Sequence, residues 1–299
     1  MPTEISSFER SAYEIVRQTF VDTADDNYVV ARWCFRNSLN VDFKWLAVHA
    51  LEKYMKAALV LNGVPVKGLG HDVREIYDKL ERIAGDLLPK LLAKPERASA
   101  VFWKEETPRR FLERLYQDGN ADNRYMLFGY VRYVEDIFKL DRTVFSVRRL
   151  CEYLDKYYYP PHVRAPVKIR EGDGVLCSYR DVLRTDLHYW GSDAGGRLVD
   201  IISGKEGEYL RNILLDWNLP FAPSDFLHSR KGMRIAAHNS ALQQFIFGAM
   251  ECGGEEERAI ALQLRDWLIQ NVKLPGEIIK ELRDVENLKG PPPLPQFPD

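Results

Sequence analysis

Apolar residues recur every three or four positions along most of this chain, which is the spacing of a helix with one buried face. In the first half, this period predicts consecutive helices over residues 26–39, 43–63, 71–84, 109–119 and 140–158. Gly63 and Pro65 should end the second helix, because neither residue favours its continuation. Asp72, with Glu75 three residues later, has the form of a capping box at the start of the third. We expect this half to fold as an antiparallel helix bundle.

The segment 157–166, "YYYPPHVRAP", cannot continue a helix because of its prolines, so we expect a linker there. A small β-hairpin is expected just after it, around Gly172 and Gly174. Helical periodicity then returns over residues 195–204, 207–217, 229–250, 255–273 and 275–288. The predicted fold is therefore all-α, with a bundle over 1–156, the linker over 157–166, a mostly helical domain over 167–289 and a proline-rich tail over 290–299.

The helix predicted over residues 43–63 is apolar around most of its circumference, which is typical of a helix inside a bundle. Between its apolar faces, His49, Lys53 and Lys56 share one narrow arc. Glu52 lies beside this arc, four residues before Lys56, in the favoured direction for an ion pair. If the arc is enclosed, each of its charges needs a partner, because an unpaired buried charge is strongly unfavourable.

This polar arc has two interpretations. His71 begins the following predicted helix and Arg32 lies on the preceding one, so both are expected neighbours of the arc. The arc is then either an internal polar network that fixes the helix register, or a pocket for phosphate or another anion.

Composition narrows the choice of partner. Lys and Arg (42) nearly balance Asp and Glu (44), so the net charge of −2 argues against a broadly basic nucleic-acid coat, and any polyanion site must be local. The four cysteines are scattered, which supports neither a disulfide framework nor a cysteine zinc site. No apolar run approaches the ~20 residues of a membrane span. We therefore expect a cytoplasmic protein with no cofactor, metal or membrane partner.

Four segments, "YVVAR", "WLAVHALEKYMKAALVLNG", "GHDV" and "DNRYML", together resemble the HEPN family of helical-bundle domains. The similarity runs from about Tyr28 to Tyr153, and its most specific residues are His49, Glu52, Lys53, Lys56, Ala57, His71 and Asp72. It also matches Arg124 and Tyr125 to an Arg-Tyr pair that is frequent late in such bundles.

The resemblance implies an up-and-down bundle that forms homo-oligomers, binds a nucleotide or RNA, and serves in stress responses, toxin–antitoxin systems or phage defence. The ligand-binding residues would be His49, Lys53, Lys56, His71 and Arg124. The structural polar network would comprise Arg32, Glu52, Asp72 and Tyr125.

The ribonuclease branch of the family carries an Arg-x4-6-His motif. None of the six histidines has an arginine at that spacing. The nearest candidates for catalysis are Arg234 and His238, which have three residues between them and would share one face of the helix predicted over 229–250. A binding or regulatory protein is therefore the preferred prediction, with a divergent metal-independent ribonuclease as the alternative and a structural dimerisation module as a second alternative.

Overall fold

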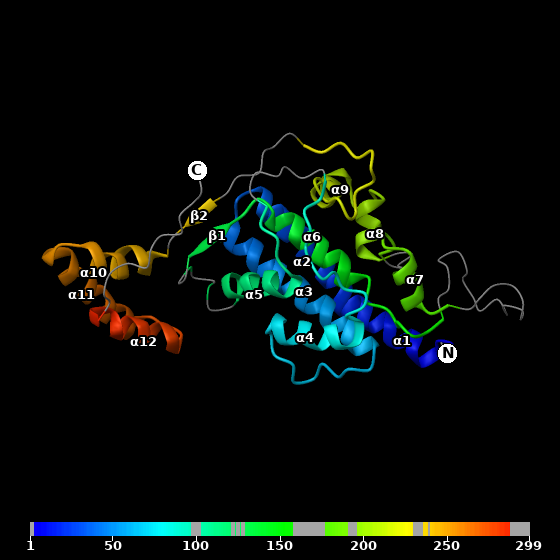
Figure 1. Cartoon of the computed structure of the whole chain (residues 1–299), viewed down its shortest axis with the longest axis horizontal. Coiled ribbons are helices and arrows are strands. Elements are labelled where there is room, and N and C mark those ends of the chain that lie inside the picture. Colours follow the sequence, from blue (N-terminus) through cyan, green and yellow to red (C-terminus); the bar gives the residue numbers. More distant parts are fainter. Residues whose placement is uncertain are drawn as a thin grey trace, which may run out of the picture. The chain divides into compact units, whose positions relative to one another are not determined.

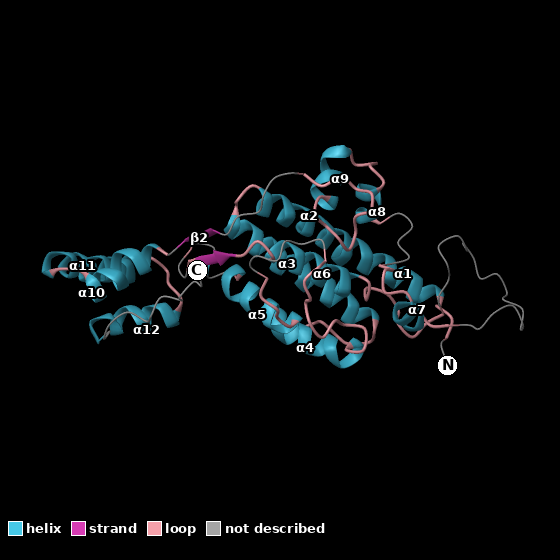
Figure 2. Cartoon of the chain, turned by 45° about the horizontal axis from the view of Figure 1, so that its top comes forward, coloured by secondary structure: helices cyan, strands magenta, loops and turns pink. Residues whose placement is uncertain are grey.

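The computed structural model describes residues 3–96, 103–120, 123, 126, 129–157, 177–190, 196–229, 236–238 and 240–287, with the backbone alone for 236–238. The chain divides into two compact units. Unit 1 comprises Met1–Gly119 and Tyr133–Arg234, and unit 2 comprises Asn120–Arg132 and Ile235–Asp299. Most of the described residues are helical, as the apolar period predicts (Figure 2).

Unit 1 is a helical bundle. Its elements are α1 (Ser7–Val16), the π-helical turn η1 (Arg17–Val21), α2 (Asp22–Arg36), α3 (Asn40–Leu61), α4 (Val73–Ala84), α5 (Pro108–Gly119), α6 (Asp136–Arg148), α7 (Tyr179–Thr185), α8 (Arg197–Ile202) and α9 (Glu208–Leu215). α2 and α3 lie side by side through its centre (Figure 1). α4 and α5 pack on α3, whereas α8 and α9 pack on α2 on the opposite side of the bundle (Figure 1).

The start of α4 and the end of α3 agree largely with the sequence. Gly63 follows α3 with φ +79°, a conformation that glycine adopts without strain. Asp72 is the N-cap of α4, as predicted, but its side chain accepts a hydrogen bond from the backbone N–H of Arg74 (2.9 Å) instead of forming the expected box with Glu75.

α6 is shorter than predicted and begins earlier, at Asp136 instead of residue 140. Asn62 explains its early end. The Asn62 side chain donates to the backbone oxygen of Glu152 (2.9 Å) and accepts from the backbone N–H of Leu154 (3.0 Å). These bonds satisfy groups that a continuing helix would have paired internally.

α5 turns one face to the core of unit 1 and the other outward. Phe111, Leu112 and Leu115 are buried on the inner face. At its end, a Cβ added to Gly119 would lie 2.5 Å from the backbone oxygen of Lys44 on α3, so only glycine allows the two helices to approach this closely. α5 is therefore held at a fixed depth against α3.

Arg32 is buried in a network that joins α2 to α6 and to the α9 end. It forms an ion pair with Asp141 and donates through Nε to the backbone oxygen of Ile213 (3.1 Å). Tyr28 donates to the other oxygen of Asp141 (2.6 Å) and accepts from Asn218 (2.9 Å). The prediction that Arg32 neighbours the arc on α3 is therefore wrong, because its guanidinium is committed to Asp141.

The division into units differs from the predicted domains. Residues 177–229 belong to unit 1, whereas the prediction placed them in a separate C-terminal domain. They are joined to α2 by specific bonds, including the bond from Leu198 N–H to the buried Asp25 (3.2 Å) and those that Arg32 donates. The expected linker beyond Tyr157, the hairpin at Gly172 and Gly174 and the tail over 290–299 lie outside the described residues.

Unit 2 contains β1 (Tyr130–Arg132), β2 (Ala236–His238), η3 (Gln243–Phe247), α10 (Gly248–Cys252), α11 (Glu255–Asn271), α12 (Gly276–Asp284) and η4 (Val285–Asn287). β1 and β2 pair antiparallel, with Val131 opposite Ala237 (Figure 2). The helix predicted over 229–250 is therefore wrong at β2. The small core formed by the described residues of unit 2 consists of Leu242, Ile246, Leu274, Ile278, Leu282 and Val285. Within the described parts of both units, no helix is long and apolar enough to cross a bilayer.

Candidate functional site

The predicted polar arc on α3 is organised around one carboxylate, that of Glu52. The Glu52 side chain is 7% exposed, and its Oε1 lies 2.7 Å from Lys56 Nζ and 3.0 Å from His71 Nδ1. His49 Nδ1 lies 3.8 Å from the second oxygen, Oε2, which accepts no hydrogen bond within the described structure. The structure thus brings His49, Lys56 and His71 together, but around the negative charge of Glu52 on α3.

Lys53 and Asp72, which are also predicted to belong to this site, contact other partners. Lys53 turns toward α2, where its ammonium donates to Asn27 Oδ1 (2.7 Å), and burial lowers its pKa. Asp72 forms an ion pair with Arg74 (2.6 Å) instead of joining Glu52. The Arg74 contact also lowers the Asp72 pKa. The arc is therefore divided among separate partners.

Arg124 and Tyr125 lie outside the described residues, and so does Arg234. The backbone of His238 lies on strand β2. The expectation that Arg234 and His238 share a helical face is therefore wrong, because a helical spacing has no meaning at a strand residue.

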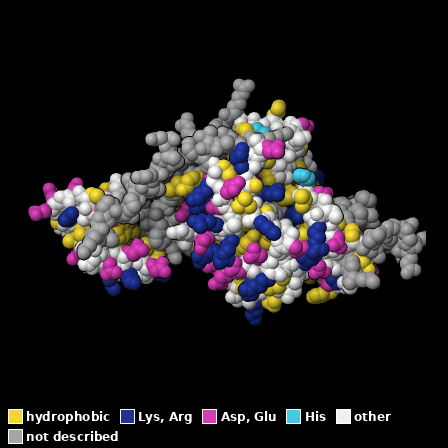
Figure 3. Space-filling model, viewed as in Figure 1, with side chains coloured by type: hydrophobic (Ala, Val, Ile, Leu, Met, Phe, Trp, Pro, Cys, Tyr) yellow, Lys and Arg dark blue, Asp and Glu magenta, His cyan; other side chains and the backbone are white. Residues whose placement is uncertain are grey.

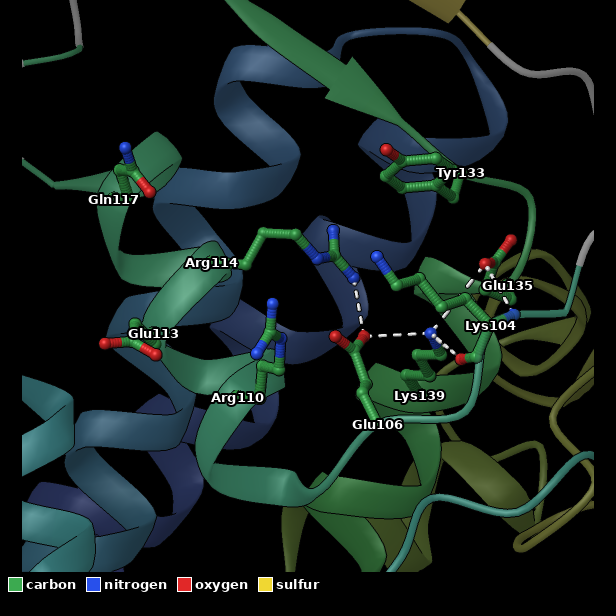
Figure 4. Close-up of a pocket in the computed structure, with 9 residues that line it drawn as sticks. All are labelled: Lys104, Glu106, Arg110, Glu113, Arg114, Gln117, Tyr133, Glu135 and Lys139. Atoms are coloured by element: carbon green, nitrogen blue, oxygen red, sulfur yellow. Dashed lines mark hydrogen bonds and ion pairs between the residues drawn. The ribbon is translucent and has the colours of Figure 1, made fainter. Parts of the chain in front are cut away.

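A second group of charged residues surrounds a cavity of about 300 Å³ in unit 1. We call this cavity the α5–α6 pocket, because α5 and the start of α6 contribute most of its lining (Figure 4). Its lining residues are Lys104, Glu106, Arg110, Glu113, Arg114, Gln117, Tyr133, Glu135 and Lys139. Basic side chains, with acidic ones among them, gather over α5 on the face of the molecule shown in Figure 3.

The pocket has a buried floor in which charges are paired. Glu106, Glu135 and Lys139 are 6%, 2% and 1% exposed. Lys139 donates to Glu106 (2.8 Å) and to the backbone oxygen of Lys104 (2.7 Å). Arg114 adds bonds from one nitrogen, Nη2, to Glu106 (2.8 Å) and to Asp136 (2.7 Å). The floor is therefore close to electrically balanced.

The rim of the pocket is different. Lys104 and Arg110 are exposed, and neither side chain pairs with a carboxylate anywhere in the described structure. Both reach toward the space above Glu106 together with the guanidinium of Arg114, while Glu113 turns away from it (Figure 4). The rim thus carries two uncompensated positive charges beside a cavity.

Burial and pairing shift the pKa values of the pocket in a consistent way. Burial raises the pKa of Glu135, whose Oε2 has no hydrogen-bond partner in the described structure. Burial acts in the same direction on Glu106, but Arg114 and Lys139 outweigh it and lower the Glu106 pKa. Burial would lower the pKa of Arg114, yet Asp136 and Glu106 raise it overall. Pairing thus favours the charged forms of Glu106 and Arg114, whereas burial raises the pKa of Glu135 above its ordinary value.

The residue pattern alone does not predict this pocket. Arg110, Glu113, Arg114 and Gln117 follow the three- and four-residue spacing of an ordinary solvated helix face. Lys139 precedes the helix start predicted at residue 140, so the pattern offered no reason to expect it in a buried ion pair. A comparison with known proteins adds no further guide, since no family model, curated protein or solved structure matches the chain.

Proposed function

We propose that this chain is a HEPN-like nucleotide-binding protein, and that the nucleotide phosphate binds in the α5–α6 pocket. The pair of uncompensated cations at the rim, Lys104 and Arg110, carries the proposal. A bound phosphate would neutralise them through charge-assisted hydrogen bonds, which are roughly twice as strong as neutral ones. The cavity volume of about 300 Å³ lies at the lower end of the range for small-molecule sites.

The family part of the proposal rests on the sequence resemblance. Three of the four segments that carry it lie on α2, α3 and the start of α4, and these helices pack consecutively in unit 1. The fourth, residues 122–127, lies largely outside the described residues and belongs to unit 2. The Glu52 cluster is less suited to a phosphate than the pocket is. An anion entering there would have to share Lys56 and His71 with a buried carboxylate, and the two negative charges would repel.

Replacing both rim cations tests the proposal. The double variant Lys104→Gln/Arg110→Gln should lose ADP affinity by ~100-fold, because each lost charge-assisted contact is worth ~1.5 kcal/mol or more. Isothermal titration calorimetry at fixed ionic strength measures this loss. The matched control is Arg82→Gln/Lys90→Gln, which removes two exposed cations of unit 1 that pair with no described carboxylate.

The control separates site binding from general charge attraction. Equal losses in the two double variants would attribute ADP binding to net charge and overturn the proposed site. Absence of ADP binding by the unmodified protein would overturn the nucleotide-binding function itself.

A further inference from the structure

The α5–α6 pocket offers more hydrogen-bond donors than its own carboxylates use. Arg114 contacts both Glu106 and Asp136 through Nη2, so its Nη1 and Nε have no acceptor among the described residues. Lys104 Nζ and the Arg110 guanidinium are likewise without a carboxylate partner there. Three side chains therefore direct unused donors toward one space above Glu106 (Figure 4).

Glu135 adds an independent sign of a ligand. Its side chain is 3% exposed, lines the pocket and leaves Oε2 without a partner. A buried polar atom without a partner is unusual in a folded protein and calls for an explanation such as a missing ligand or water. Burial also raises the pKa of Glu135 above its ordinary value.

The shape and charge of the pocket distinguish between kinds of phosphate. Its floor is closed by Glu106, Glu135 and Lys139, each at most 6% exposed, so a ligand must enter and leave by the rim. A phosphodiester within a chain continues on both sides and carries one negative charge. A terminal monoester ends at the phosphate, carries about −1.5 to −2 charges at pH 7 and presents three acceptor oxygens. The converging donors match the monoester.

We propose that the α5–α6 pocket recognises a terminal phosphate monoester, as found on a mononucleotide or at the phosphorylated end of an RNA. This inference rests on the proposed nucleotide-binding function and specifies the part of the ligand that enters the pocket. Lys104, Arg110 and Arg114 hold the phosphate oxygens in the space above Glu106.

Two ligands that differ only in the phosphate test the inference. AMP has a monoester, whereas 3′,5′-cyclic AMP has a diester on the same nucleoside. We expect AMP to bind at least 10-fold more tightly by calorimetry, and we expect Lys104→Gln/Arg110→Gln to remove this preference while Arg82→Gln/Lys90→Gln retains it. A second arm compares one RNA oligonucleotide with a 5′-phosphate and with a 5′-hydroxyl, by fluorescence anisotropy.

The possible outcomes distinguish failure of the monoester inference from failure of the proposed nucleotide-binding function. A preference for AMP alone supports the monoester on a free nucleotide, and a preference for the 5′-phosphorylated RNA as well supports it at an RNA end. Equal affinity for AMP and cyclic AMP, with ADP binding still dependent on Lys104 and Arg110, overturns the monoester inference and leaves nucleotide binding intact. If ADP does not bind either, both fall.

Discussion

Glu135 shows how one residue can set the electrostatics of the pocket. It is the N-cap of α6 and lies among Lys104 and Glu106 from the preceding segment, Arg110 and Arg114 from α5, and Asp136 and Lys139 from α6. Its nearest cation, Lys139 Nζ, is 3.7 Å away and already donates to Glu106. Burial therefore dominates, and the Glu135 pKa is raised.

A raised pKa in the folded state makes stability depend on pH in a definite direction. The folded protein binds a proton at Glu135 more tightly than the unfolded chain does, so the free energy of unfolding falls as the pH rises from about 4.5, the ordinary value, through the raised pKa. Glu135→Gln does not titrate. The difference in unfolding free energy, variant minus unmodified protein, should therefore increase with pH across this window.

Urea denaturation between pH 4.5 and about pH 8 measures this difference. Glu113→Gln is the matched control, since it removes an exposed carboxylate that faces away on α5 (Figure 4). A difference that stays constant with pH for Glu135→Gln would contradict the raised pKa.

At the scale of elements, α3 shows what a helical wheel can and cannot establish. The sequence placed it correctly as a central helix, and its residues Phe43, Ala47, Tyr54 and Leu51 are fully buried. The wheel also grouped His49, Lys53 and Lys56 on one arc, but neighbouring elements divide them. Glu52 holds Lys56 and His71, whereas Asn27 on α2 takes Lys53.

We expect the cluster around Glu52 to stabilise the folded protein. Glu52→Gln leaves the Lys56 ammonium, whose side chain is 12% exposed, without its counter-charge, so we expect a loss of ~2 kcal/mol in the free energy of unfolding. The control, Glu14→Gln, removes an exposed carboxylate on α1 that pairs with Arg17. It should lower the free energy of unfolding by less than ~1 kcal/mol. Urea denaturation gives both values.

The same two variants also separate structure from ligand binding. If the cluster only fixes α3 and the start of α4, Glu52→Gln should leave ADP affinity within about twofold of the unmodified protein. A loss of affinity as large as that of the rim variant would instead make the Glu52 cluster part of the proposed nucleotide site.

At the scale of the whole molecule, the two units differ in how much apolar surface they bury. Unit 1 buries large side chains from all of its central helices, including Tyr28, Phe43, Phe111 and Leu140. Among the described residues of unit 2, the core contains six buried apolar residues, and of the 17 residues of α11 only Ala261 is buried. Since burial of apolar surface is the main source of stability, unit 2 should open more readily.

Hydrogen exchange followed by mass spectrometry tests this difference. After correction for intrinsic rates, amides of α3 should exchange at least ~10-fold more slowly than those of α11, because opening α3 requires loss of the whole unit 1 core. Equal protection of α3 and α11 would mean that both units open in a single cooperative event.

The sequence by itself determined the helical character of the chain and most of its long helices. The helices α3, α4, α5, α11 and α12 lie close to their predicted ranges. Helical hydrogen bonds are local, so the apolar residues within a few turns are enough to predict an amphipathic helix. It does not predict α1, whose Phe8 and Ile15 are exposed and whose start depends on the capping box of Ser6 with Glu9. It is wrong at β2, because strand pairing depends on a distant partner, β1.

Only the tertiary structure decided which segments share a unit and which charges meet. Residues 177–229 join unit 1 through contacts with Asp25 and Arg32, partners more than 150 positions away. The α5–α6 pocket likewise gathers residues 104–139 from three separate segments, and pairing within its floor leaves the rim cations free of carboxylates. Such pairings depend on how the buried faces of the helices pack. A local pattern of residues therefore cannot predict which charged side chain from a distant segment will be the partner.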